Sequence, residues 1–327
     1  MLFNLFFCDC YGCNINENAR KIVEAGSFTV AGCVFISISS IGAGGCLYCR
    51  DTSTTLRIET TMFFNISSNN FGGCIYFLSS LSSNVLLSYI CSSQSSASCY
   101  SFALLCTHSS GINSIIHSSI SAISIGSESL TLISGSQIVK NINISKCVTP
   151  TVSTLQVSNP SSMESLFITI FRTRATNSKI ISFGHGKGPI TISYVNFISN
   201  NQSSNSYGLI SLIKGDYSFI QAIFNENNGL LFYVEKIADT YLRILNSKIG
   251  HQSGFISTGS VIFSAAPLTA TGVVLPTHNF THYSSFYCQT QELPLYKPTH
   301  MHTDRKWVCF VMYSIILTGC YHQDFAC

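Results

Sequence analysis

The sequence predicts an all-β protein whose chain winds into a right-handed parallel β-helix, a solenoid of stacked rungs. The first reason is a repeat. Phe35–Tyr48 (FISISSIGAGGCLY) and Phe63–Tyr76 (FFNISSNNFGGCIY) are identical at eight of fourteen positions. Self-similarity with a period of about 20–50 residues is typical of solenoids, propellers and arrays. The second reason is that apolar residues alternate with small polar ones, as they do in β-strands, and show no helical spacing over three turns.

The length of the repeat selects the solenoid from the other repeat folds. A rung of 27 or 28 residues accommodates three strands and their turns, and each strand then pairs in parallel with its copy about 4.8 Å away. This predicts that Phe35 lies directly above Phe63. Parallel crossovers are almost always right-handed, which sets the expected hand. A β-propeller blade needs about 40–45 residues, and a leucine-rich repeat needs a regular Leu-x-x-Leu-x-Leu pattern that the sequence lacks.

Four segments follow along the chain. We expect residues 1–34 to form an N-terminal cap or partial rung, because a solenoid must cover its open end. Residues 35–265 form the β-helix, with strands of four to six residues and a loop bulging out at Ser95–Cys106. A second copy of the pattern occurs there, with Phe-x-x-Asn at Phe197–Asn200 and Phe224–Asn227. Residues 266–306 are a tail that contains four of the seven prolines and four of the nine histidines.

The last segment, 307–321, is a candidate membrane segment. Trp307–Cys320 is apolar over 14 residues, whereas a helix that spans a bilayer needs about 20. Arg305 and Lys306 precede it and no basic residue follows, which is opposite to the positive-inside rule for an extracellular N-terminal body. Membrane association through Trp307–Tyr321 and a buried or irregular tail are therefore both open.

Composition points to a secreted or cell-surface protein. Charged residues make up 9% of the chain, against about 25% in ordinary soluble domains. The net charge of +3 comes with no basic cluster, so we expect no nucleic-acid partner. Fifteen cysteines and four Asn-x-Ser/Thr sequences suit an oxidising compartment. Residues 1–7 lack a basic region and a continuous apolar run, so we expect the chain to be a fragment of a longer secreted protein.

The repeat marks several candidate functional residues. The pairs Gly44–Gly45 and Gly72–Gly73 are expected at corners, where they supply a positive φ or a close backbone approach. Cys46 and Cys74 occupy equivalent positions on adjacent rungs, within the range of Cα separations that a disulfide accepts. Either they form an inter-rung disulfide or they are two small buried thiols on an inward ladder. The candidate N-glycosylation sites are Asn65, Asn143, Asn201 and Asn279.

These motifs resemble a known family. Gly-Gly-Cys46-Leu47 and Gly-Gly-Cys74-Ile75 are similar to the Gly-Gly-Ala-Ile motif of polymorphic outer-membrane-protein-like repeats, and Phe197–Asn200 and Phe224–Asn227 match the accompanying Phe-x-x-Asn motif. Surface proteins of trichomonad parasites, which carry such repeats, resemble the chain most closely, over roughly 35–265. The resemblance implies a β-helical ectodomain on a cell surface, often with a C-terminal membrane segment, that serves in adhesion or host contact. Cys in place of Ala is a departure from the motif.

Motifs for chemistry are weak in this sequence. Gly184-His185-Gly186 resembles the Gly-His-Gly of polygalacturonases, but glycoside hydrolysis generally needs two carboxylates. No Asp occurs between Asp51 and Asp216, and Glu128 and Glu164 stand alone, so we interpret the motif as a turn with an exposed histidine. The C-x-x-C pairs at Cys10–Cys13 and Cys46–Cys49 are too far apart for a zinc ribbon. His278, His282, His300 and His302 lack the helical context of a metal site, so neither a metal nor another cofactor is expected.

We therefore expect a non-enzymatic cell-surface β-helix protein, secreted or displayed, that serves in adhesion or surface display. Its partner would be an unknown host or cell-surface ligand, either protein or glycan. The alternative from another class is a carbohydrate-active β-helix enzyme, a polysaccharide lyase or hydrolase. Such an enzyme would require carboxylates that converge on one face. An inactive gene fragment is a third alternative.

Overall fold

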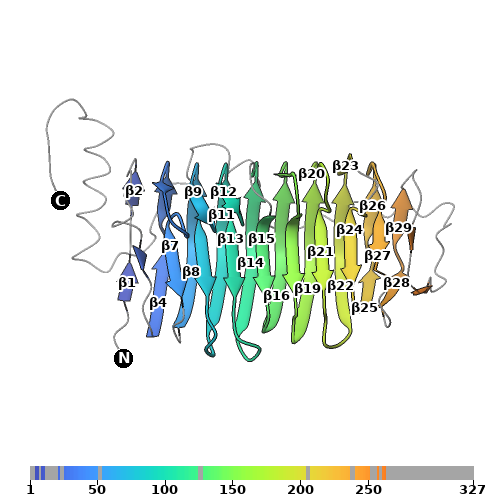
Figure 1. The fold of residues 1–327 in the computed structure, drawn as a ribbon, viewed down its shortest axis with the longest axis horizontal. Helices are drawn as coiled ribbons and strands as arrows, with labels where there is room; N and C mark the ends of the chain where they lie inside the picture. Colours follow the sequence, from blue (N-terminus) through green and yellow to red (C-terminus); the bar gives the residue numbers. More distant parts are fainter. Residues whose placement is uncertain are drawn as a thin grey trace, which may run out of the picture. The chain divides into compact units, whose positions relative to one another are not determined.

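The chain folds into a stack of parallel strands (Figure 1). The computed structural model describes residues 4–6, 9–11, 21–22, 26–50, 54–123, 128–203, 207–235, 240–250, 256–257 and 260–262. Within these ranges the chain forms strands, turns and bends but no helix, and each pair of neighbouring strands is parallel. The predicted all-β parallel β-helix is therefore confirmed. The tail at 266–306 and the segment 307–321 lie outside the described residues.

The largest sheet has 15 strands and is called the long sheet here. Its strands are β1 (Asn4–Phe6), β2 (Asp9–Tyr11), β4 (Gly26–Ala31), β5 (Val34–Ile36), β8 (Thr54–Phe64), β11 (Asn84–Ser93), β14 (Ile112–Ser121), β16 (Ser136–Ser145), β19 (Ser162–Phe171), β22 (Ile190–Ile198), β25 (Gly215–Ile220), β26 (Ile223–Asn225), β28 (Thr240–Leu245), β29 (Lys248–Gly250) and β31 (Ser260–Ile262). Since β1, β2 and β4 belong to this sheet, the stack of strands starts before residue 35.

The second sheet has ten strands and is called the ten-stranded sheet. It consists of β3 (Lys21–Ile22), β7 (Leu47–Arg50), β10 (Ile75–Leu78), β13 (Ala103–Cys106), β15 (Glu128–Ile133), β18 (Ser153–Ser158), β21 (Ile181–Gly184), β24 (Ile210–Ile213), β27 (Phe232–Val234) and β30 (Ile256–Ser257). Two short sheets complete the rungs, with β6 (Ser39–Ser40), β9 (Ser67–Phe71) and β12 (Ser96–Cys99) in one and β17 (Val148–Thr149), β20 (Arg174–Ala175) and β23 (Asn201–Gln202) in the other.

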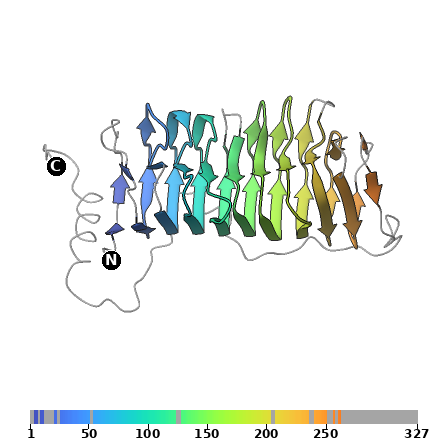
Figure 2. The ribbon, with the colours of Figure 1, turned by 60° about the horizontal axis from the view of Figure 1, so that its bottom comes forward.

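Equivalent residues of the repeat lie above one another, as the sequence predicts. Phe35 pairs with Phe63 across β5 and β8, and their rings stack with centroids 5.2 Å apart and planes 6° apart. Tyr48 and Tyr76 stack in the same way, with centroids 5.4 Å apart. Figure 2, in which the view of Figure 1 is turned by 60°, shows the rungs following one another along the stack. The spacing of the two sequence copies is therefore the true register of the coil at these rungs.

The rungs differ in length, which explains why the repeat fades in the middle of the sequence. The offset between paired residues is 29 from Leu56 to Val85 and only 24 from Asn113 to Gln137. The predicted loop at Ser95–Cys106 is wrong, because β12 and β13 occupy that segment and continue the sheets. The sequence predicts a loop there because the serines and cysteines of the segment do not alternate with large apolar residues. The segment forms strands because it pairs with preceding strands that do show this alternation.

The central strands of the long sheet are longer than the four to six residues expected. β8 has 11 residues, β11, β14, β16 and β19 have 10 residues each, and β22 has 9 residues. Each of them runs through a left-handed residue near its middle. These residues are Thr60, Tyr89, His117, Asn141, Phe167 and Tyr194, with φ between 46° and 58°. A left-handed residue turns the backbone without ending the ladder, so two strands of the expected length form one bent strand.

The interior of the coil is filled by columns of apolar side chains, one from each rung, which form one continuous cluster. Burying an Ile or Phe side chain contributes about 1.5–3 kcal/mol, so these columns stabilise the stack without a globular core. Near the shortest rung, two amides interrupt the column. Asn113 donates to the Thr107 hydroxyl at 3.1 Å, and Gln137 donates to the Ser134 carbonyl. Their hydrogen bonds compensate part of the cost of burying polar groups.

Candidate functional site

The glycine pairs of the repeat precede two strands of the ten-stranded sheet and have different roles. Gly44 and Gly72 have φ of +70° and +64°, which favours glycine. Gly45 and Gly73 are needed for space, because a Cβ on Gly45 would lie 2.1 Å from the Gly73 carbonyl oxygen. A Cβ on Gly73 would lie 2.0 Å from the carbonyl oxygen of Ser101 on the next rung. Each pair thus sets both the turn and the close approach of adjacent rungs.

Cys46 and Cys74 follow these glycines and point into the core. The Cys46 amide donates to the Cys74 carbonyl at 3.0 Å, so the two residues lie on adjacent rungs. The Cys74 sulfur lies 3.1 Å from the Ser95 hydroxyl oxygen. Burial raises the pKa of the Cys74 thiol to about 12, although Ser95 and Ser92 oppose the shift. The inter-rung disulfide stays a prediction, with the buried thiols as its alternative.

The candidate glycosylation sites differ in accessibility. Asn65 and Asn201 are exposed, Asn65 at a bend and Asn201 in β23, and the Asn65 amide donates to the Ser37 hydroxyl at 3.1 Å. Asn143 is 6% exposed and donates to the Ser119 hydroxyl at 3.3 Å, so a glycan there would displace a packed side chain. Asn279 lies outside the described residues, as does Trp307–Tyr321. Within the part of the chain that the structure describes, no helix is both long and apolar enough to cross a membrane.

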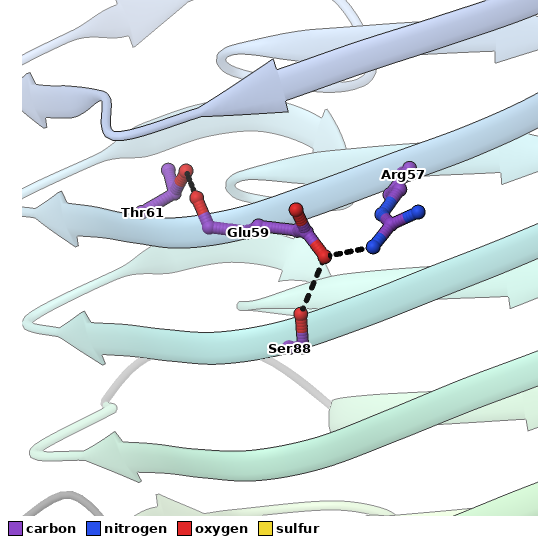
Figure 3. Close-up of polar contacts among 4 residues, drawn as sticks. All are labelled: Arg57, Glu59, Thr61 and Ser88. Carbon is purple, nitrogen blue, oxygen red and sulfur yellow. Dashed lines mark hydrogen bonds and ion pairs between the residues drawn. The ribbon is translucent and has the colours of Figure 1, made fainter.

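Three acidic side chains on the long sheet form ion pairs at separate places. Glu59 accepts from Arg57 at 2.6 Å and from the Ser88 hydroxyl at 3.4 Å, while its backbone carbonyl accepts from Thr61 (Figure 3). Lys140 pairs with Glu164 and Arg243 with Asp216, each across one rung. Glu164 thus lies four rungs from Glu59 and two rungs from Asp216 along the stack, and each carboxylate is neutralised by its own cation.

The Gly184-His185-Gly186 motif lies at the end of β21. His185 is exposed, has φ of 54° and donates its backbone N–H to the Ile213 carbonyl at 2.8 Å. It therefore occupies a turn, as interpreted from the sequence. In the described ranges, no three His, Cys, Asp or Glu residues come together as metal ligands. The histidines of the tail lie outside these ranges.

Glu128 does not stand alone in the folded chain. It begins β15, where it is 8% exposed, and its Oε2 accepts from the Thr131 hydroxyl at 2.8 Å. Its other oxygen, Oε1, makes no hydrogen bond within the described residues. Burial raises the pKa of this carboxyl, while Thr131 and Lys179 lower it. A carboxyl group with an unused oxygen is thus held at the side of the ten-stranded sheet.

Lys179 lies two rungs further along the same side. Its amide donates to the Val152 carbonyl at 3.2 Å, which places it one rung beyond Ser153, the residue that pairs with Glu128. Two rungs separate residues by about 10 Å, twice the strand spacing. Burial lowers the pKa of the Lys179 ammonium, and Glu128 and Glu235 raise it. Lys179 forms no ion pair in the described part of the chain, although it faces these carboxylates.

Tyrosines flank this acid and base on both sides. Tyr100 precedes Ser101, whose amide donates to the Glu128 carbonyl at 2.6 Å, and Glu128 contributes to raising the Tyr100 pKa, after burial. At the other end, the Lys179 ammonium lies 5.8 Å from the centroid of the Tyr207 ring. The Tyr207 ring meets that of Tyr233 edge-on at 6.2 Å. The rings therefore bracket a polar stretch of the sheet.

The side chains between the tyrosines that face away from the apolar columns are hydroxyls and amides. Thr131, Gln156 and Ser182 pair successively across β15, β18 and β21. Thr131 and Ser182 are buried, whereas Gln156 is partly exposed and donates to the Ser158 hydroxyl at 3.1 Å. We give the name tyrosine-flanked strip to the set Tyr100, Glu128, Thr131, Gln156, Lys179 and Tyr207.

Sequence reasoning missed the tyrosine-flanked strip because its members share no motif. Glu128 and Lys179 belong to different rungs, and neither occupies a position that the repeat marks. The one hint in the sequence is that Glu128 is an isolated charged residue in a stretch rich in serine and leucine.

Comparisons with known proteins give no relative from which to transfer a function. The chain matches no protein-family model, no curated protein sequence and no solved structure. The tyrosine-flanked strip is therefore interpreted from its own chemistry.

Proposed function

We propose that this protein is a non-enzymatic cell-surface or secreted adhesin that binds its partner through the tyrosine-flanked strip. The observation that carries the proposal is the arrangement of the strip. Two tyrosines bracket hydroxyl, amide, acid and base groups that lie on consecutive rungs of one sheet. Tyr is enriched in interfaces because its ring adds contact area at low entropic cost while its hydroxyl forms hydrogen bonds.

The charge distribution supports binding over hydrolysis. Inverting and retaining glycosidases place two carboxyl groups about 5–10 Å apart across the scissile bond. The carboxylates of Glu59, Glu164 and Asp216 instead pair with their own cations on separate rungs. In the strip, Glu128 has Lys179 two rungs away and Thr131 beside it. This combination suits hydrogen bonding to a partner.

The proposal includes membership of the polymorphic outer-membrane-protein-like repeat type, of which trichomonad surface proteins are examples. The fold gives both motifs a structural reason. Phe197 and Phe224 are buried in the core, and Asn200 and Asn227 are joined by a hydrogen bond between rungs. Glycosylation at the exposed Asn65 and Asn201, and membrane association through Trp307–Tyr321, belong to the same proposal.

Surface labelling tests the proposed location. Intact cells of the source organism are treated with a membrane-impermeant biotin reagent, and a second sample is permeabilised first. A cell-surface protein is labelled equally in both samples. Labelling that depends on permeabilisation would contradict a surface location, and recovery from the culture medium would indicate the secreted form.

Adhesion is tested with latex beads that carry the full chain and are applied to a monolayer of cultured epithelial cells. Tyr207→Ala should reduce bead binding, because it removes one of the two bracketing rings. The matched control is Tyr89→Ala, since Tyr89 and Tyr207 are both 45% exposed and Tyr89 lies on the long sheet. Equal losses in the two variants, or no binding by the unmodified protein, would contradict the proposal.

A further inference from the structure

The strip contains hydrogen-bonding groups of opposite kind, of which Lys179 is partly exposed and Glu128 is 8% exposed. Glu128 Oε1 accepts no hydrogen bond in the described part of the chain, and Lys179 forms no ion pair there. The two groups lie on the same side of the ten-stranded sheet, two rungs apart, with Ser153 between them. From this geometry we infer that the tyrosine-flanked strip binds an uncharged polysaccharide chain laid along the solenoid.

Hydroxyl groups suit both ends of this arrangement. A hydroxyl donates one hydrogen bond and accepts two, so hydroxyls of the same chain can donate to the Glu128 carboxyl and accept from the Lys179 ammonium. A polyanion would pair with the Lys179 ammonium but would be repelled by the Glu128 carboxylate. A polycation would pair with Glu128 but would be repelled by Lys179. A protein can reject a competitor by such an unpaired like charge. The strip therefore favours a ligand without net charge.

The tyrosine rings provide the apolar part of the site. Tyr207 is 45% exposed, so the strip ends in an accessible ring, and Tyr100 is half-buried at the other end. Ligand sites combine aromatic contact surface with a few polar groups that fix orientation. A sugar ring has an apolar face of C–H groups and an equatorial rim of hydroxyls, which matches rings beside hydroxyl and amide side chains.

The spacing of the accessible groups also fits a polymer. Gln156 and Lys179 are partly exposed and Tyr207 is exposed. Lys179 and Tyr207 belong to consecutive rungs, those of β21 and β24, which lie about 4.8 Å apart. Gln156 pairs with Ser182 and therefore lies three residues to the side of Lys179. A linear polysaccharide laid along the stack can therefore meet Lys179 and Tyr207 in succession, with Gln156 to one side of it. This inference rests on the proposed binding function and specifies its ligand class.

Affinity gel electrophoresis of the folded full chain tests the inference. The gels contain hydroxyethylcellulose or galactomannan as neutral polysaccharides, or polygalacturonate as a polyanion. We expect retardation in at least one neutral gel, and this retardation should persist in about 0.5 M salt because no charge pairing drives it. Tyr207→Ala should raise the dissociation constant about three- to tenfold, as expected for the loss of one ring contact.

Tyr89→Ala is the matched control and should leave retardation unchanged. Circular dichroism and the unfolding midpoint show whether each variant is folded. A folded Tyr207→Ala that is retarded like the unmodified chain would overturn the inference. Retardation by polygalacturonate alone, or retardation abolished by salt, would also overturn it. If the beads adhere to cells but no neutral gel retards the protein, the proposed ligand class is refuted and the adhesin proposal is not. If a neutral gel retards the protein but the beads do not adhere, the adhesin proposal is refuted and the ligand class is not.

Discussion

The side-chain amide of Asn200 donates to the Oδ1 of Asn227 at 3.1 Å, although the two residues are 27 positions apart. Asn200 Oδ1 in turn accepts from the Thr173 amide at 2.9 Å, and Asn227 Nδ2 donates to the Phe197 carbonyl at 2.8 Å. Both side chains are buried. The amides thus connect consecutive rungs at a corner, where the backbone leaves the regular ladder and its polar groups need other partners.

We predict that Asn200→Ala lowers the free energy of unfolding by about 2–4 kcal/mol, because it leaves the buried Thr173 amide without its acceptor and removes the side-chain hydrogen bonds to Ile170 and Asn227. Equilibrium unfolding in urea measures the change. Asn201→Ala is the control, since Asn201 is exposed and water can replace its contact with Asn228. Similar effects of both substitutions would show that the buried ladder is not the cause.

The second prediction concerns the glycine pairs. Gly45→Ala should destabilise the fold by at least about 2 kcal/mol, because the added Cβ would overlap the Gly73 carbonyl oxygen and force the two rungs apart. The thermal unfolding midpoint reports the loss. At Gly188 no atom lies within 4 Å of an added Cβ, so Gly188→Ala should leave the midpoint nearly unchanged. A tolerated Gly45→Ala would contradict the close approach of the rungs.

The third prediction distinguishes the two states of Cys46 and Cys74. Because burial raises the pKa of Cys74 to about 12, almost no thiolate is present at mildly alkaline pH, and the native thiol should resist a maleimide reagent. Among the described cysteines, the partly exposed Cys99 should react before Cys74. After denaturation without reductant, mass spectrometry should find Cys46 and Cys74 separately alkylated. A cross-linked peptide that contains both residues would instead establish the inter-rung disulfide.

The fourth prediction is a pH dependence at Glu128. Burial raises its pKa in the folded state, so folding favours the protonated carboxyl. The contribution of this group to stability is therefore fully present below the ordinary carboxyl pKa and is lost as the pH rises through the raised folded-state pKa. Glu128→Gln imitates the protonated form and keeps an acceptor for Thr131. It should raise the free energy of unfolding at neutral pH and have little effect in acid.

Urea unfolding of both proteins over a series of pH values tests this dependence. Glu164→Gln serves as the control, because Glu164 is an exposed partner of Lys140 and such ion pairs contribute less than about 1 kcal/mol. A loss of stability in Glu128→Gln at neutral pH would mean that attraction to Lys179 outweighs the cost of burying the carboxylate.

The amino-acid sequence by itself determines the period, the strand pattern and the register of the coil. Like residues recur at the rung interval because stacked rungs place equivalent side chains in the same environment, so Phe35 can be paired with Phe63 from the repeat alone. The glycine pairs can be placed at corners for the same reason.

The bends of the long strands and the membership of the strip depend instead on contacts between rungs. The left-handed residues at the bends include Thr60, Tyr89 and Phe167, types with no local preference for that conformation. The ladder to the neighbouring rungs imposes it on them. Glu128 and Lys179 likewise come to the same side of one sheet, two rungs apart, only through the pairing of β15, β18 and β21. Neither the bends nor the membership of the strip can be predicted from local sequence, because both arise from pairing between segments that are distant in the chain.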